Sequence, residues 1–212
     1  MHDDTHFLRS ARASLLLAST LLCSAAMAGS GAIPTDKDKY PKGVAAAPAV
    51  ASQCLACHGP TGQSENEEWP NLAGQKQSYL LQQLKDFKSG ARKHPMMAPA
   101  VAALTDADLK PLADYLSAQA PAQPHLPAGQ TTAVAPAAAA SCVACHDNAA
   151  LPTEPFLHAQ KATYMVAQLK AFKAGTRKNA TMEAMSNMLS EQDIDAISHY
   201  FSTLAPLPAV KK

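Results

Sequence analysis

The strongest constraint on this chain is a five-residue motif that occurs twice. Residues 54–58 read Cys-Leu-Ala-Cys-His and residues 142–146 read Cys-Val-Ala-Cys-His. Two thiols three positions apart lie on adjacent turns of a short helix, where they can add to the two vinyl groups of one haem. The histidine that follows is placed to ligate the haem iron. The sequence therefore predicts two covalent haem c groups, and the residues that hold them are Cys54, Cys57 and His58, and Cys142, Cys145 and His146.

Zinc sites and thiol-disulfide exchange also use two cysteines at this spacing, but neither requires a histidine at the next position. The chain has five cysteines. The fifth, Cys23, lies in an N-terminal segment that we expect to be removed. Every cysteine of the mature chain then belongs to one of the two motifs, which favours the haem interpretation.

The N-terminus has the features of a secretory signal peptide. Arg9 and Arg12 precede an apolar run over residues 15–22, and Ala26-Met27-Ala28 forms a small-x-small cleavage site. We predict a signal peptide over residues 1–28 and a periplasmic location, and we regard lipidation at Cys23 as the weaker alternative. No other apolar run is long enough to span a membrane. The formal net charge of +1 gives no reason to expect binding to nucleic acid.

The region between the motifs is repeated after the second motif. Pro70 and Pro155 are 85 positions apart, and the same shift superposes residues over the rest of both copies. We expect a solvated tail over residues 29–43, one domain over 44–118, a linker rich in proline and alanine over 119–135, and a second domain over 136–207. The superposed residues include Gln75, Tyr79, Gln83, Arg92 and Met97 in the first copy and Gln160, Tyr164, Gln168, Arg177 and Met182 in the second.

Apolar spacing and capping patterns predict an all-α fold. A first helix over residues 44–54 leads into the haem motif, and an amphipathic helix over residues 79–87 ends at Gly90. Residues 92–97 then form a loop. The last helix of each copy begins with a capping box, which starts at Thr105 or Ser190. The predicted buried positions of these last helices are Leu109, Leu112 and Leu116 in the first copy and Ile194, Ile197 and Phe201 in the second.

A methionine between the last two predicted helices of each copy can supply the sixth iron ligand. Met97 and Met182 superpose under the shift, so we predict them as ligands. Three other methionines have no counterpart in the opposite copy and are interpreted as core residues, because methionine commonly fills gaps in a core. They are Met96, Met185 and Met188.

Further residues are candidates for supporting roles at the haem. Pro70 and Pro155 can offer a carbonyl to the second ring nitrogen of each haem histidine, although an ordinary turn proline is an equal alternative. Arg92 and Arg177 have two possible roles, pairing with haem propionates or remaining solvated at the surface. Tyr79 and Tyr164 are interpreted as core residues of a helix face, and the unmatched histidines as residues without a ligand role; these are His94, His125, His158 and His199.

The ordered series of motifs from Cys54 to Tyr115 resembles class I cytochrome c, and the tandem arrangement resembles dihaem cytochrome c4. This resemblance implies two helical domains with one covalent haem each and His/Met axial ligation. It also implies periplasmic electron transfer from a quinol-oxidising complex to a terminal oxidase, with redox proteins as the partners. The second copy departs from the family pattern at Asp147, which replaces Gly59, and in Leu157-His158-Ala159-Gln160, which stands where the first copy has Leu72-Ala73-Gly74-Gln75. We therefore expect the two haems to differ in reduction potential.

Two other functions stay open at this point. The chain can be the cytochrome subunit of a periplasmic dehydrogenase, such as a flavocytochrome c sulfide dehydrogenase. It can also be a small dihaem enzyme with one open iron. We favour an electron carrier over an enzyme, because both copies offer methionine as a sixth ligand and leave no position for a small-molecule substrate.

Overall fold

The computed structural model describes residues 47–124, 126 and 129–207, which fall within one compact unit spanning residues 33–212. All regular elements among these described residues are helices, which confirms the predicted all-α class. The signal peptide, the N-terminal tail, Cys23 and His125 lie outside the described residues.

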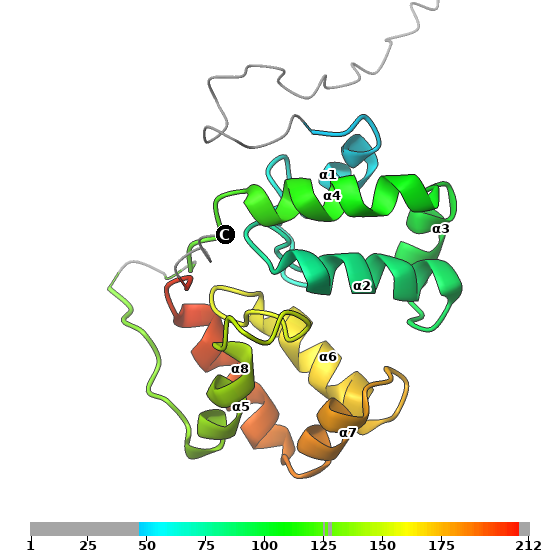
Figure 1. Cartoon of the computed structure of the whole chain (residues 1–212). Helices are drawn as coiled ribbons and strands as arrows, with labels where there is room; N and C mark the ends of the chain where they lie inside the picture. Colours follow the sequence, from blue (N-terminus) through cyan, green and yellow to red (C-terminus); the bar gives the residue numbers. More distant parts are fainter. Residues whose placement is uncertain (1–46, 125, 127–128, 208–212) are drawn as a thin grey trace, which may run out of the picture. The chain divides into compact units, whose positions relative to one another are not determined.

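The first copy contains four helices, α1 to α4 (Figure 1). Helix α1 begins later than the sequence predicts, because Pro48 stands before the helix in a turn in which Ala51 N–H donates to the Pro48 carbonyl. The predicted span of 44–54 is therefore wrong over residues 47–50, and the helix instead carries the whole haem motif. The four helices are α1 Ala51–His58, α2 Gln77–Ser89, α3 Met97–Ala102 and α4 Asp106–Ala118.

Helices α2 and α4 pack against each other and build most of the first core. Gly90 ends α2 in the left-handed conformation, as predicted. A capping box between Thr105 and Asp108 opens α4. The side chains of α4 that the spacing assigns to the core are buried, and they are Leu109, Leu112 and Leu116.

The second copy repeats this arrangement with α6 and α8 as the packed pair. The capping box at Ser190 is present, and the three predicted core residues of α8 are buried: Ile194, Ile197 and Phe201. The elements of this copy are the 3-10 helix Ala137–Ala139, α5 Ala140–His146, α6 Ala162–Lys173, α7 Ala180–Asn187 and α8 Glu191–Thr203.

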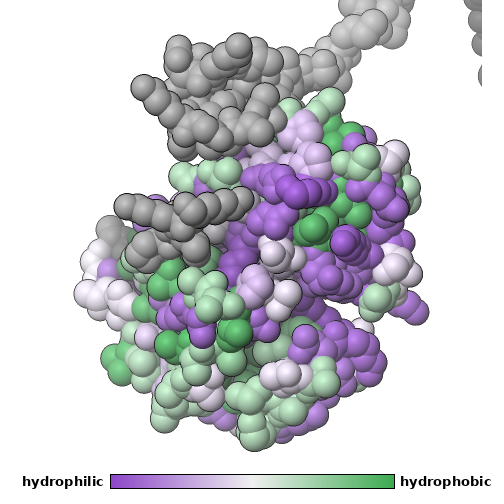
Figure 2. Space-filling model, viewed as in Figure 1, coloured by the Kyte–Doolittle hydropathy of each residue, from purple (hydrophilic) through white to green (hydrophobic). Residues whose placement is uncertain are grey.

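Helices α3 and α7 are short elements that the sequence patterns did not predict. The prediction that Met96 and Met188, which flank these helices, are core residues is wrong. These two residues are 59% and 70% exposed. On the face drawn in Figure 2, both hydrophilic and hydrophobic residues are exposed.

The linker contacts the first copy near its start and the second copy near its end. Gln63 donates to the carbonyl of Ala120, and Ala133 N–H donates to the hydroxyl of Thr203. Its described residues form no helix or strand. Within the described part of the chain, no helix combines the length and apolar character needed to cross a membrane.

Candidate haem sites and the contact between the two copies

Each haem motif lies on one short helix with its histidine at the C-terminal end. In α1 the His58 ring is buried, Cys54 is half-buried and Cys57 is exposed. In α5 the His146 ring is likewise buried, and both thiols are half-buried. Each motif thus combines two thiols that are at least partly exposed with a buried histidine.

Both buried histidines bond a proline carbonyl. The distance from His58 Nδ1 to Pro70 O is 2.9 Å, and that from His146 Nδ1 to Pro155 O is 2.6 Å. A carbonyl oxygen only accepts, so Nδ1 must carry the proton. Nε2, which has no hydrogen bond from the described residues, is then the unprotonated nitrogen, the form that ligates a metal. These residues fit a haem iron.

Burial favours the neutral form of both imidazoles. It lowers the pKa of His58, although the bond to Pro70 acts in the opposite direction. The pKa of His146 is lowered for the same reason, with the Pro155 bond again opposing burial. Because a protonated imidazole cannot bind iron, the lowered pKa values favour ligation at neutral pH.

The predicted methionines occupy corresponding short helices. Met97 is the first residue of α3, and its half-buried side chain packs on the same core as Cys54. Met182 lies in α7, is half-buried, and has its backbone N–H bonded to the Asn179 side chain at the helix start. Each copy thus presents a methionine on a separate element from the haem motif.

Comparison with known proteins agrees with this geometry. The family model for cytochrome c matches residues 44–120 and again residues 132–205. Cytochrome c4 of Pseudomonas aeruginosa is 36% identical over 180 residues, which cover 76% of this chain and 88% of that relative. The chain belongs to the cytochrome c4 family.

Two further relatives extend the comparison. The structure of Acidithiobacillus ferrooxidans cytochrome c4 superposes with a TM-score of 0.61 at 30% identity, covering 73% of this chain and 99% of that one. A thiosulfate dehydrogenase electron acceptor of Stutzerimonas stutzeri is 33% identical, covering 73% of this chain and 80% of that relative. The chain is thus an electron carrier with two covalently attached haem c groups, and its partners are redox proteins.

Two residues at which the second copy departs from the family pattern, Asp147 and His158, contact each other. His158 Nε2 lies 3.1 Å from Asp147 Oδ1, and His158 Nδ1 lies 2.8 Å from the carbonyl of Ala205. The side chain of His158 therefore ties the residue after the haem histidine to the C-terminal end of the described chain. The sequence flags both residues singly, and the structure shows that they form one contact.

The loops that follow the two haem histidines are bonded to each other through glutamines. Asn71 N–H donates to Gln160 Oε1 at 2.8 Å, and Gln160 Nε2 donates to Asn71 O at 2.9 Å. Reciprocally, Phe156 N–H donates to Gln75 Oε1 and Gln75 Nε2 donates to Phe156 O, both at 2.9 Å. Each glutamine thus holds both backbone groups of one residue in the opposite copy.

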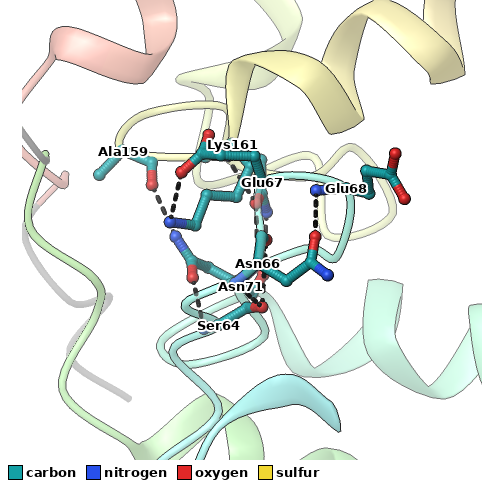
Figure 3. A network of polar contacts seen from close by, with 8 residues as sticks. Ser64, Asn66, Glu67, Glu68, Asn71, Ala159 and Lys161 are labelled. Atoms are coloured by element: carbon teal, nitrogen blue, oxygen red, sulfur yellow. Dashed lines mark hydrogen bonds and ion pairs between the residues drawn. The ribbon is translucent and has the colours of Figure 1, made fainter.

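Two lysines extend this contact. Lys161 Nζ lies 2.9 Å from Glu67 Oε1 in the acidic loop of the first copy, and Asn71 Nδ2 donates to the Ala159 carbonyl nearby (Figure 3). Lys76 Nζ donates to the carbonyls of Asn148 and Leu151 in the second copy. Burial lowers the pKa of Lys76.

The repeated arginines also lie between the copies, so the interpretation of them as solvated surface residues is wrong. Arg92 donates to Tyr164 and to Gln168, at 3.1 and 2.7 Å. Arg177 donates in the same way to Tyr79 and Gln83, at 3.2 and 2.9 Å. The two tyrosines are therefore more than core residues of a helix face, because their hydroxyls contact the opposite copy.

Sequence reasoning missed the residues that join the copies. Gln75 and Gln160 superpose under the repeat although they lie outside the helices, where apolar spacing cannot account for them. A polar residue repeated in register in a loop was the signal that could have identified them.

Proposed function

We propose that this protein carries single electrons in the periplasm from a quinol-oxidising complex to a terminal oxidase, with axial pairs His58/Met97 and His146/Met182. The observation that best supports this proposal is that each haem histidine bonds a proline carbonyl through Nδ1, while its Nε2 has no hydrogen-bond partner among residues 47–124, 126 and 129–207. Haem iron supplies reversible one-electron exchange when it is bound. The chain contributes the ligands, their orientation and a buried setting.

The methionine assignment is supported by the repeat and by burial. Met97 packs on the core that also contacts Cys54, whereas its neighbour Met96 is largely exposed. In the second copy Met188 is exposed in the same manner, whereas Met182 and Met185 are both half-buried, and of these two only Met182 superposes on Met97. A thioether ligand on both irons raises their potentials and leaves no open coordination position.

Haem propionates are the proposed counter-charges of Arg92 and Arg177. Neither guanidinium has a carboxylate within 4.0 Å in the described part of the chain, and each bonds neutral groups instead. Two such cations at one contact favour a bound anion. We expect Arg92→Gln to lower a haem potential, because removal of a positive charge stabilises the oxidised form.

Carbon monoxide tests the ligation. The reduced, haem-loaded protein is expected to keep its visible spectrum when carbon monoxide is added, because neither iron gives up a ligand readily. A shift in about half of the haem would show one open iron and would favour the enzyme alternative.

The matched pair Met182→Ala and Met188→Ala sharpens this test. Loss of Met182 is expected to make the second haem bind carbon monoxide, while loss of the exposed Met188 changes nothing. Unchanged ligation in Met182→Ala would contradict the assignment.

A second candidate function is acceptance of electrons from a thiosulfate dehydrogenase. It is favoured by the similarity to relatives named as electron acceptors of that enzyme. Stopped-flow reduction of the oxidised protein by a thiosulfate dehydrogenase with thiosulfate, beside reduction by a quinol-oxidising complex with quinol, discriminates between the two donors. The mass of the exported protein tests the periplasmic location and cleavage after Ala28.

A further inference from the structure

One peptide group links each haem histidine to the opposite copy. Pro70 O, which accepts the proton of His58, and Asn71 N–H, which donates to Gln160, belong to the same amide. A hydrogen bond donated at one end of an amide polarises it and makes its oxygen a stronger acceptor. Gln160 therefore strengthens the bond that the Pro70 carbonyl makes to His58.

The second copy contains the mirror chain of bonds. The amide between Pro155 and Phe156 accepts from His146 at its oxygen and donates to Gln75 at its nitrogen. Both haem histidines thus lie two hydrogen bonds away from a glutamine of the other copy.

We propose that Gln75 and Gln160 are positioning residues, each of which tunes the haem of the opposite copy through the proline carbonyl that orients its histidine. This inference rests on the axial role proposed above for His58 and His146.

The two glutamines are held well enough to act in this way. Gln75 and Gln160 are only 7% and 8% exposed, so water cannot readily replace their amides. The Oε1 of each glutamine also accepts from the backbone N–H of the following residue, Lys76 or Lys161, at 2.9 Å. These bonds fix the amide plane and aim the oxygen at the opposite loop.

The direction of the effect follows from the histidine. A strong acceptor on Nδ1–H makes the imidazole a better donor to the iron and stabilises the oxidised state. Removal of a glutamine weakens that acceptor. Gln160→Leu is therefore expected to raise the potential of the first haem, and Gln75→Leu that of the second.

The experiment uses the full-length, haem-loaded protein and follows each haem separately. Haem methyl resonances, assigned to one copy by their proximity to its residues, are recorded by NMR during a redox titration. In Gln160→Leu the first haem is expected to become easier to reduce and the His58 Nδ1–H to exchange faster with deuterium, while the second haem is unchanged. Gln75→Leu is expected to give the reverse pattern.

Gln160→Glu provides the control with opposite sign. Its carboxylate keeps an acceptor for Asn71 N–H and adds negative charge, so the first haem is expected to become harder to reduce. Loss of structure alone would not reverse sign between two substitutions at one position. If Gln160→Leu does not accumulate, Gln160→Glu carries the test by itself.

The outcomes separate this inference from the function on which it rests. A shift at the haem of the same copy, equal shifts at both haems, or no shift in variants that retain both haems overturns the role of the glutamines. Failure of the unsubstituted protein to show two histidine-ligated haems instead overturns the proposed ligation.

Discussion

The segment from haem histidine to proline is built differently in the two copies. It spans twelve positions in the first copy and nine in the second. In the first copy the Gly62 carbonyl closes the loop by accepting from the backbone N–H groups of Leu72 and Ala73. In the second copy the side chains of Asp147 and His158 close it.

The conformation of the residue after the histidine follows from this difference. Gly59 has a φ of +83°, and a Cβ there would lie 1.9 Å from the Gln63 carbonyl oxygen. Asp147 has a φ of −89° in the right-handed helical region, so a side chain fits. The hydrogen bond from histidine to proline is present in both copies. The loop between these two residues can therefore differ in length and conformation while the hydrogen bond is kept.

The largest effect should come from a side chain at Gly59. We expect Gly59→Ala to cost the first copy about 3 kcal/mol, since the strained φ and the clash with Gln63 act together. Guanidinium unfolding followed by the fluorescence of Trp69, the chain's single tryptophan, measures this copy. Gly90→Ala is the matched control, because the φ of Gly90 is +78° and a Cβ there would meet no atom of the described chain within 4 Å. This substitution should cost only about 1 kcal/mol. Equal costs for Gly59→Ala and Gly90→Ala would show that the clash with Gln63 does not add to the cost of the backbone conformation.

A smaller effect is expected where side chains close the loop. His158→Ala should destabilise the second copy by about 2 kcal/mol, because it leaves the partly buried Asp147 carboxylate without its partner. Unfolding monitored at the second haem measures the loss. Lys110→Ala, which breaks an exposed ion pair with Asp114, should cost less than about 0.5 kcal/mol. The double variant tests the contact. If adding Asp147→Ala restores the stability lost in His158→Ala, the two side chains act as a unit, whereas additive losses of unfolding free energy would refute the contact.

The cores of the last helices also differ. Ser198 of α8 is fully buried with no hydrogen-bond partner for its hydroxyl among the described residues, whereas Ala113 occupies the matching position of α4. Ala113→Ser should therefore cost about 1 kcal/mol, while Ser198→Ala should be neutral or slightly stabilising. Thermal unfolding of both variants checks the pair. A marked loss of stability in Ser198→Ala would show that this hydroxyl has a partner in the haem-loaded protein.

The smallest effect is expected at Ala159, which has a φ of +53° where the first copy has Gly74. Glycine adopts this conformation without steric cost but loses more backbone entropy on folding. Ala159→Gly should therefore stabilise the second copy by only about 0.5 kcal/mol, as measured by denaturant unfolding. A loss of stability would indicate that the Ala159 methyl group contributes packing that outweighs the strain.

Much of the scaffold could be predicted because its signals are local. Capping boxes and apolar spacing identified α4 and α8, and the glycine after α2 identified its end. The short helices α3 and α7 escaped prediction, since six to eight residues give too little periodicity to recognise.

The site was predictable only within each copy. The repeat pointed to Pro70 and Pro155, whose carbonyls lie within hydrogen-bond distance of the histidines. The glutamine bonds and the Asp147–His158 contact depend on residues brought together by tertiary structure, and no local pattern encodes such a meeting.

The reciprocal glutamine contact has the form of an isologous interface, in which each partner offers the same surface that it receives. Two identical subunits make such an interface around a two-fold axis. Here the linker joins the two halves covalently, and a covalent tether can give the groups it joins an effective concentration on the order of millimolar. The chain therefore behaves as a dimer that dilution cannot separate, and each half is free to diverge, as the two loops have, without losing its partner.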